Sequence, residues 1–270
     1  MIEPYELAPE PEAPKLPGTV IVRETADAII DFLGAELVGH AMECVRAFGD
    51  FHLALSGGST PEPLYRRLMY DPPLRKLPWK RTHLWIVDER RVPEDDERSN
   101  FRMIRSYICE HSDIPAEQVH PMPATDANGD ILYEKELREH LGWREKGHDR
   151  LDYVLLGMGD DAHTASLFPN SPALDAGERL VVGNDGPNVT PPARLTMTYR
   201  LINASRFIAV LVTGSRKRDT IARVEAAATG GGGMPRELPI LGVDPVGGEL
   251  RWYLDRDACS DPEAREQGGA

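Results

Sequence analysis

Four times along this chain, a short apolar run ends in a turn rich in polar residues, and a helical pattern follows. The runs are FHLAL, THLWIV, LDYVLL and RFIAVLV, and each has a length suited to one buried strand. Apolar strands that alternate with helices indicate βα units on a parallel sheet covered on both faces. The pattern therefore predicts an α/β fold with a single domain, in which helices flank a mostly parallel central sheet.

The same pattern sets the limits of the predicted domain. Residues 1–17 are rich in proline and glutamate, which is typical of a disordered tail. The domain is expected over 18–257, beginning with the strand TVIVR and an amphipathic helix that ends near Gly49, and a polar tail over 258–270. Within the domain, the sequence also predicts a helix around 130–141, a loop-rich connection at 170–193 and a flexible turn at 230–233.

The net charge limits the class of partner. With a formal net charge of −13 and a pI near 5.1, the chain lacks the clustered cations that nucleic acids and anionic membranes require. The first residues show no signal-peptide pattern, and no apolar run reaches a membrane-spanning length. We expect a cytoplasmic protein, a monomer or weak homo-oligomer, whose partner is a small molecule rather than a nucleic acid or a membrane.

The cysteines indicate no covalent framework and no metal site. Cys44, Cys109 and Cys259 are odd in number, far apart and without CxxC or Cys/His spacing. Neither a disulfide nor a zinc site is therefore predicted.

The first polar turn, SGGSTP, contains Gly57, Gly58, Ser59 and Thr60. Ligands of parallel α/β sheets bind beyond the carboxyl ends of the strands, so all four turns are expected along one edge. The glycines permit close approach of an anion, and Ser59 or Thr60 is suited to cap the next helix. The spacings GxxxxGK[ST] and GxGxxG are absent. An ordinary strand–helix turn with a good cap is the alternative.

The second turn carries Asp88 and Arg90 within DERR, directly after an apolar strand. Charges at this point face either solvent or a cleft, and their place on the predicted ligand edge favours the cleft. Ser99 and Asn100 are expected to begin the next helix. A solvated run of charges is the alternative.

The third turn, in GMGDDAHTASLFP, contains Asp160, Asp161 and His163. We predict a strand, a glycine turn and a helix start, where unpaired N–H groups favour an anionic ligand. A neighbouring carboxylate orients an imidazole, so His163 is the candidate base, with a structural histidine as the alternative. The other seven histidines have no such neighbourhood in the sequence. A Ser-His-Asp triad is disfavoured because GxSxG is absent and Ser166 would be helical.

The fourth turn, GSRK, ends at Lys217 and opens a helix directly after the last of the four strands. A lysine at a helix start is suited to bind a phosphate as a compact cation. Upstream, Arg194 in ARLTMTYRLIN offers a planar guanidinium that matches a phosphate or a carboxylate. An exposed side chain without a ligand is the alternative for both residues.

Taken in order, SGGSTP, DERRVP followed by SN, GMGDDAHTASLFP, ARLTMTYRLIN and TGSRK resemble the successive motifs of 6-phosphogluconolactonases of the pentose phosphate pathway. The resemblance covers roughly residues 19–256, and HTASLFP is its most discriminating part. It implies a single α/β domain related to the Rossmann-like sugar-phosphate isomerase fold. It also implies hydrolysis of 6-phospho-D-glucono-1,5-lactone to 6-phosphogluconate without a metal or an organic cofactor.

Lactone hydrolysis needs an activated water, stabilisation of the oxyanion and a clamp for the distant phosphate. The hypothesis that follows makes His163 the general base, with Asp161 or Asp160 tuning it. By resemblance to the family, Arg194 and Lys217 bind the phosphate. The remaining substrate contacts implied by the resemblance are Gly57, Gly58, Ser59, Thr60, Asp88 and Arg90.

One residue departs from the family pattern, which usually reads D-G-H where this chain has Asp161-Ala162-His163. If Ala162 has a positive φ, the conformation costs about 1 kcal/mol or more and the turn that carries His163 is displaced. If its φ is negative, the alanine is harmless.

Two rival functions share the fold. Glucosamine-6-phosphate deaminases resemble this chain in the glycine–aspartate–histidine turn but continue with asparagine-glutamate-proline, where this chain has Leu167, Phe168 and Pro169. The missing carboxylate favours the lactonase. The other rival is a non-catalytic sugar-phosphate sensor, for which Ala162 is the sole hint; neither a helix-turn-helix extension nor a basic patch is evident in the sequence.

Overall fold

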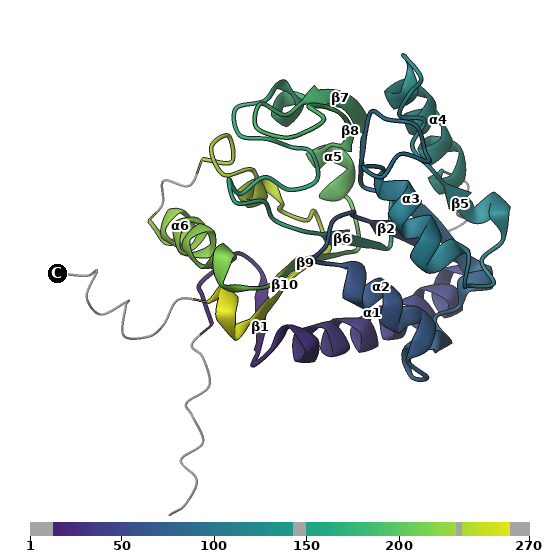
Figure 1. Ribbon diagram of the computed structural model, residues 1–270, viewed down its shortest axis with the longest axis horizontal. Coiled ribbons are helices and arrows are strands. Elements are labelled where there is room, and N and C mark those ends of the chain that lie inside the picture. The colour runs from purple at the N-terminus through teal and green to yellow at the C-terminus, as the bar shows by residue number, and fades with distance from the viewer. Residues whose placement is uncertain (1–12, 143–149, 231–233, 260–270) are drawn as a thin grey trace, which may run out of the picture.

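A parallel sheet of seven strands forms the centre of the computed structural model, which describes residues 13–142, 150–230 and 234–259 (Figure 1). The strand order is β1-β10-β9-β6-β2-β3-β5, and every neighbouring pair is parallel. The predicted fold class is therefore confirmed, and the four predicted apolar runs form β2, β3, β6 and β9. The strands are β1 (Thr19–Arg23), β2 (Phe51–Leu55), β3 (Thr82–Ile86), β5 (Val119–His120), β6 (Tyr153–Leu156), β9 (Phe207–Val212) and β10 (Glu249–Asp255).

Helices cover both faces of this sheet, as the buried strands require. Helix α1 packs on the face that carries Phe51 and Tyr153, since its His40 ring lies 5.8 Å from Tyr153. Helix α4 packs on the opposite face, where its Tyr133 ring lies 5.8 Å from Trp85 (Figure 1). The helices are α1 (Ala26–Phe48), α2 (Glu62–Tyr70), α3 (Asn100–Ile104), α4 (Gly129–Leu141), α5 (Tyr199–Ile202) and α6 (Arg218–Thr229).

Helix α1 shows why the sequence pattern predicted its limits well. The Thr25 side chain accepts a hydrogen bond from the Ala28 amide at 3.2 Å and so caps the first turn. Gly49, at φ 94°, ends the helix in the left-handed conformation. Between these caps, Ile29, Leu33 and Leu37 are fully buried at three-to-four spacing.

A second, smaller sheet of three strands was not predicted. It consists of β4 (Asp88–Arg90), β8 (Ala193–Met197) and β7 (Val181–Asp185) in the antiparallel order β4-β8-β7. The turn DERR is therefore partly a strand that continues from β3, and the loop-rich prediction at 170–193 is wrong over β7. The pairing joins segments about a hundred residues apart, which local sequence patterns do not reveal.

The predicted helix after the third turn is also wrong. Residues 163–169 are not helical, and Thr164 and Leu167 form an isolated antiparallel bridge. Ala162, Ala165 and Asn170 have φ angles of 65°, 50° and 59°. Left-handed residues at such spacing interrupt a right-handed helix, so Ser166 lies in a loop rather than on a helix.

The domain limits differ slightly from the prediction. Leu16 is buried, and the Pro17 carbonyl accepts a hydrogen bond from Trp252 Nε1 at 2.8 Å, so the end of the predicted tail packs on the domain. Ala258 and Cys259 are buried as well. Residues 1–12 and 260–270 of the predicted tails, and 231–233 of the glycine turn, lie outside the described residues. Among the described helices, none is long and apolar enough to cross a membrane.

Candidate active site

The sheet order places the four polar turns on one edge. Strands β9, β6, β2 and β3 are consecutive neighbours and run in the same direction, so the turns that follow them all leave the carboxyl edge. The order of the strands along the chain reverses between β2 and β6. Ligands of open α/β sheets bind at such a switch point. The first and third turns, which contain Gly57 and His163, flank it.

The first turn is held tightly against its neighbours. Ser56 Oγ donates a hydrogen bond to the Leu155 carbonyl at 2.8 Å, which ties the ends of β2 and β6 together. A Cβ at Gly57 would lie 1.9 Å from Asn100 Oδ1, so only glycine fits this close approach. Ser59 and Thr60 do not cap α2; its N-cap is Pro61, and no described side chain accepts from the first turn. The capping prediction is wrong, and the helix start is open to a ligand.

The second turn connects the first turn to the third. Asn100 Nδ2 donates to the Asp88 carbonyl at 2.7 Å, and Ser166 Oγ donates to Asp88 Oδ2 at 2.6 Å. All three side chains are buried. The chain of contacts runs from Gly57 through Asn100 and Asp88 to Ser166, so the first two turns are linked to the loop that follows His163.

Glu89 is a buried carboxylate that the sequence analysis did not single out. It accepts hydrogen bonds from the Asn100 amide at 2.7 Å and the Phe101 amide at 2.8 Å, and from Ser99 Oγ at 3.0 Å. Burial raises the pKa of Glu89, and these hydrogen bonds oppose the rise. Glu89 therefore acts as the anchor of the α3 start. The signal for it was its position inside DERR, two residues after the end of the apolar run THLWIV. Ser99 caps α3 through Arg102 N, as predicted.

Arg90 and Arg194 lie opposite each other on paired strands. They are register partners of β4 and β8. Arg194 is 4% exposed, and its Nη1 has no hydrogen-bond partner among the described residues. Burial and the charge of Arg90 lower the pKa of the Arg194 guanidinium, while Asp88 and Glu89 oppose this effect. A buried guanidinium nitrogen without a partner is costly unless an anion binds it.

His163 is bound to one of the two predicted carboxylates. Its Nδ1 lies 2.5 Å from Asp161 Oδ1, and its backbone amide donates to the same oxygen at 3.1 Å. Burial alone would raise the pKa of Asp161, but the hydrogen bond and charge of His163 outweigh it, so the pKa is lowered. Because a carboxylate accepts, Nδ1 carries the proton and Nε2 keeps its lone pair. The 26% exposure of the His163 side chain leaves it accessible.

The turn that carries His163 contains the departure from the family pattern. Ala162 is fully buried and has φ 65°, the left-handed conformation that favours glycine. Its carbonyl accepts a hydrogen bond from the Ile240 amide at 3.0 Å, which fixes the turn from outside. The condition under which the alanine is costly is therefore met, while His163 remains paired with Asp161.

The side chain of Asp160 pairs with the fourth turn and not with His163. Its carboxylate forms an ion pair with Lys217 Nζ, and its carbonyl accepts from Thr220 Oγ1 at 2.9 Å. Asp160 is 76% exposed, whereas Lys217 is 20% exposed. The two aspartates of the motif thus hold different partners, and the third and fourth turns meet through Asp160.

Apolar side chains fill the position after the histidine. Leu167 and Phe168 are buried, and the Phe168 ring centroid lies 4.9 Å from that of His163. A carboxylate at either buried position would lose its hydration, which is costly.

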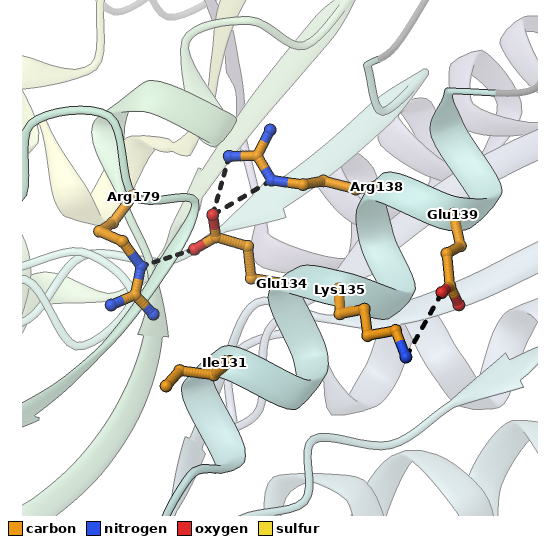
Figure 2. Close-up of a pocket in the computed structure, with 6 residues that line it drawn as sticks. All are labelled: Ile131, Glu134, Lys135, Arg138, Glu139 and Arg179. Carbon is orange, nitrogen blue, oxygen red and sulfur yellow. Dashed lines mark hydrogen bonds and ion pairs between the residues drawn. The ribbon is translucent and has the colours of Figure 1, made fainter.

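A pocket of about 520 Å³ lies elsewhere, on the outer side of α4 (Figure 2). Its charged side chains pair with one another: Glu134 binds both Arg138 and Arg179, and Lys135 lies 3.7 Å from Glu139. Charges neutralised in this way leave little to attract a polar ligand, and the lining includes none of the predicted site residues. Within the described ranges, two groups of side chains have ligand atoms close enough to hold a metal ion, and neither group includes a predicted site residue.

The fold and the carboxyl edge define an α/β protein with a candidate ligand site at the switch point of a parallel sheet. The chain belongs to the glucosamine-6-phosphate isomerase/6-phosphogluconolactonase family, whose model matches residues 24–252. It is similar to a 6-phosphogluconolactonase of Nostoc sp., with 40% identity over 80% of this chain and 87% of that protein.

Two further comparisons agree with this family. The human GDH/6PGL endoplasmic bifunctional protein is 37% identical over 95% of this chain, but the chain spans a third (33%) of that protein's length. The crystal structure of a 6-phosphogluconolactonase from Thermotoga maritima has a TM-score of 0.74 and 28% identity, covering 88% of this chain and 99% of that one. The family and the fold inferred from the sequence are confirmed.

Proposed function

We propose that the protein hydrolyses 6-phospho-D-glucono-1,5-lactone to 6-phosphogluconate, with His163 as the general base. The observation that carries the proposal is the His163–Asp161 pair at the switch point, which leaves Nε2 of the imidazole available to water. Relatives named 6-phosphogluconolactonase, at 37% to 42% identity over most of the chain, support the same reaction.

The pair accounts for the proton transfers. His163 Nε2 takes a proton from water as the oxygen attacks the lactone carbonyl, and the tetrahedral oxyanion forms. The ring C–O bond then breaks, and the leaving ring oxygen receives the proton from Nε2. Asp161 stabilises the imidazolium between these steps and holds the ring in one tautomer. The product acid ionises and releases one proton per turnover.

The phosphate and the sugar are assigned to the charged groups of the same edge. Arg194 and Lys217 bind the phosphate, because the Arg194 Nη1, which has no hydrogen-bond partner among the described residues, and the Lys217 ammonium supply positive charge. At Lys217, the phosphate binds the ammonium group either in place of the Asp160 carboxylate or together with it. The substrate contacts proposed besides these are Gly57, Gly58, Ser59, Thr60, Asp88 and Arg90.

The rival deaminase is disfavoured by Leu167 and Phe168, which are buried apolar residues where that reaction needs an acid. We further propose that the protein works in the cytoplasm, as a monomer or weak homo-oligomer, on a small-molecule substrate.

The test is to mix purified protein with freshly prepared 6-phosphogluconolactone and follow acid release. We expect release well above the spontaneous rate, competitive inhibition by 6-phosphogluconate, and no ammonia from glucosamine 6-phosphate. Ammonia release would favour the deaminase, and binding without acceleration would favour the sensor.

A further inference from the structure

Four histidines gather on the face of the sheet that α4 covers. His52 and His83 are register partners on β2 and β3, and Trp85 and His120 are register partners on β3 and β5. Because residues two apart on a strand share a face, these side chains all point to the same side. His140, near the end of α4, closes the group: its ring centroid lies 4.6 Å from that of His120.

This cluster shares no residue with the proposed lactone site, although His120, the last residue of β5, lies at the carboxyl end of that strand. His83 is the second residue of β3, whereas Asp88 and the polar turns follow the carboxyl end of that strand. Three residues of strand, about 10 Å, separate His83 from Ile86. The function proposed above does not use any histidine of the cluster.

The hydrogen bonds of the cluster orient its ring nitrogens. His120 Nδ1 lies 2.6 Å from Glu136 Oε1, and His140 Nδ1 lies 3.0 Å from the Glu136 carbonyl. Both oxygens accept, so both histidines carry their proton on Nδ1 and their lone pair on Nε2. His120 Nε2 in turn lies 3.0 Å from His83 Nδ1. Three ring nitrogens therefore converge from two strands and a helix.

We propose that His83, His120 and His140 bind one divalent transition-metal ion of the Zn²⁺ type. Each offers one ring nitrogen, and the three nitrogens lie within 4.8 Å of one another. With Zn–N distances of about 2.0–2.1 Å, nitrogens on one ion lie roughly 3.0–3.4 Å apart, which the His83–His120 pair already satisfies. The His140 nitrogen lies within 4.8 Å of the other two and moves closer when the ion binds. For His83 to bind through Nδ1, its proton moves from Nδ1 to Nε2.

The surroundings suit a metal ion. The carboxylate–histidine contact of Glu136 and His120 is the arrangement that orients imidazole ligands of zinc. His83 and His140 are partly exposed, which gives the ion an entry path. A water molecule takes the fourth ligand position.

The competing explanation is a stacked packing cluster without a ligand. Trp85 lies 3.8 Å from the His120 ring centroid at an interplanar angle of 9°, so stacking alone stabilises part of the group. Stacking and the His83–His120 hydrogen bond hold these two rings without an ion, whereas a metal site also uses the His140 nitrogen, which lies within 4.8 Å of the other two. The two explanations differ in whether added metal binds there.

The experiment uses the full chain without a histidine tag, treated with a chelator and titrated with Zn²⁺ by calorimetry. We expect one ion per chain, and affinity about tenfold or more weaker in both H83Q and H140Q. Excess Zn²⁺ should raise the Tm of the unmodified protein by about 5 °C. The shift should be lost in both variants.

Two control variants locate the ion. H111Q changes an exposed histidine outside the cluster, and H163Q removes the imidazole of the proposed lactone site; both should bind Zn²⁺ as the unmodified protein does. Since H83Q alters a strand, Co²⁺ absorption in the unmodified protein provides a readout that needs no variant, and visible bands of a tetrahedral site are expected. No binding, unchanged affinity in H83Q or H140Q, or loss of the ion in H163Q would overturn the proposal.

Discussion

The imidazole of His163 and the carboxylate of Asp161 form a hydrogen bond of 2.5 Å, between Nδ1 and Oδ1, within one three-residue turn. The intervening residue, Ala162, has a left-handed backbone that turns both side chains toward each other. The adjacent acid, Asp160, is bound to Lys217 instead. The motif thus separates two tasks, the orientation of a base and the placement of a cation.

Asp161→Asn should lower kcat about 100-fold, because the amide neither fixes the tautomer nor stabilises the imidazolium. KM should change little. The measurement is steady-state acid release with fresh lactone, and Asp160→Asn is the matched control, since it removes the neighbouring carboxylate and should act on KM. A larger loss of kcat in Asp160→Asn than in Asp161→Asn would contradict the assignment.

The same pair predicts how stability depends on pH. The pKa of Asp161 is lowered below its ordinary value of 3.8 by His163, despite burial that raises it. Its contribution is therefore fully present above that ordinary value and is lost as pH falls through the lowered pKa. Asp161→Asn should be less stable than the unmodified protein at neutral pH, and the gap should close in acid. Urea titrations at several pH values measure it; a gap that widens in acid would refute the sign.

Lys217→Ala should raise KM about 10- to 100-fold with a smaller change in kcat, because a charge-assisted contact to the phosphate is lost. Asp160→Asn should lower KM, since it frees the ammonium. Lys135→Ala, on the outer side of α4, is the control and should leave both constants unchanged. An unchanged KM in Lys217→Ala would remove this residue from the phosphate site.

Gly57→Ala should lower both stability and kcat/KM, because the new Cβ would lie 1.9 Å from Asn100 Oδ1. Relief of the overlap displaces Asn100, which holds Asp88, and costs about 1–3 kcal/mol of unfolding free energy. Gly39→Ala is the control: nothing lies within 4 Å of its Cβ, and it should stabilise α1 by about 0.5–1 kcal/mol. Thermal unfolding measures the stability of both variants. Equal stabilities of Gly57→Ala and Gly39→Ala would contradict the close contact between Gly57 and Asn100.

Ala162→Gly should raise the unfolding free energy by about 0.5 kcal/mol, because relief of the left-handed strain exceeds the loss of one buried methyl group. Ala41→Gly, at a buried helical position of α1, should instead lose about 1 kcal/mol. Denaturant titrations compare the two. A loss of stability in Ala162→Gly would mean that packing of the methyl group dominates.

The sequence predicted what local patterns determine. The apolar runs and the polar turns predicted β2, β3, β6 and β9 and the edge of the sheet where a ligand binds. The predicted end of α1 near Gly49 agrees with the structure, in which Thr25 and Gly49 cap this helix. Residues 163–169 were predicted as a helix because their composition suits one, and left-handed Ala162 and Ala165 override it.

Contacts between segments that are distant in the sequence could not be predicted from local patterns. The pairing of β4 with β8, which sets Arg90 opposite Arg194, joins residues about a hundred positions apart. Which aspartate binds His163 depends on the turn geometry rather than on spacing. The histidine cluster was missed for the same reason, although His52 and His83 occupy the same place in FHLAL and THLWI.

The role of His163 is tested by comparing acid release from fresh 6-phosphogluconolactone by the unmodified protein and by His163→Ala. We expect the unmodified protein to accelerate release far above the spontaneous rate, and the folded variant to have a kcat about two to four orders of magnitude lower. Circular dichroism confirms that the variant is folded. Near-normal kcat in His163→Ala, or no acceleration by the unmodified protein, would contradict this role.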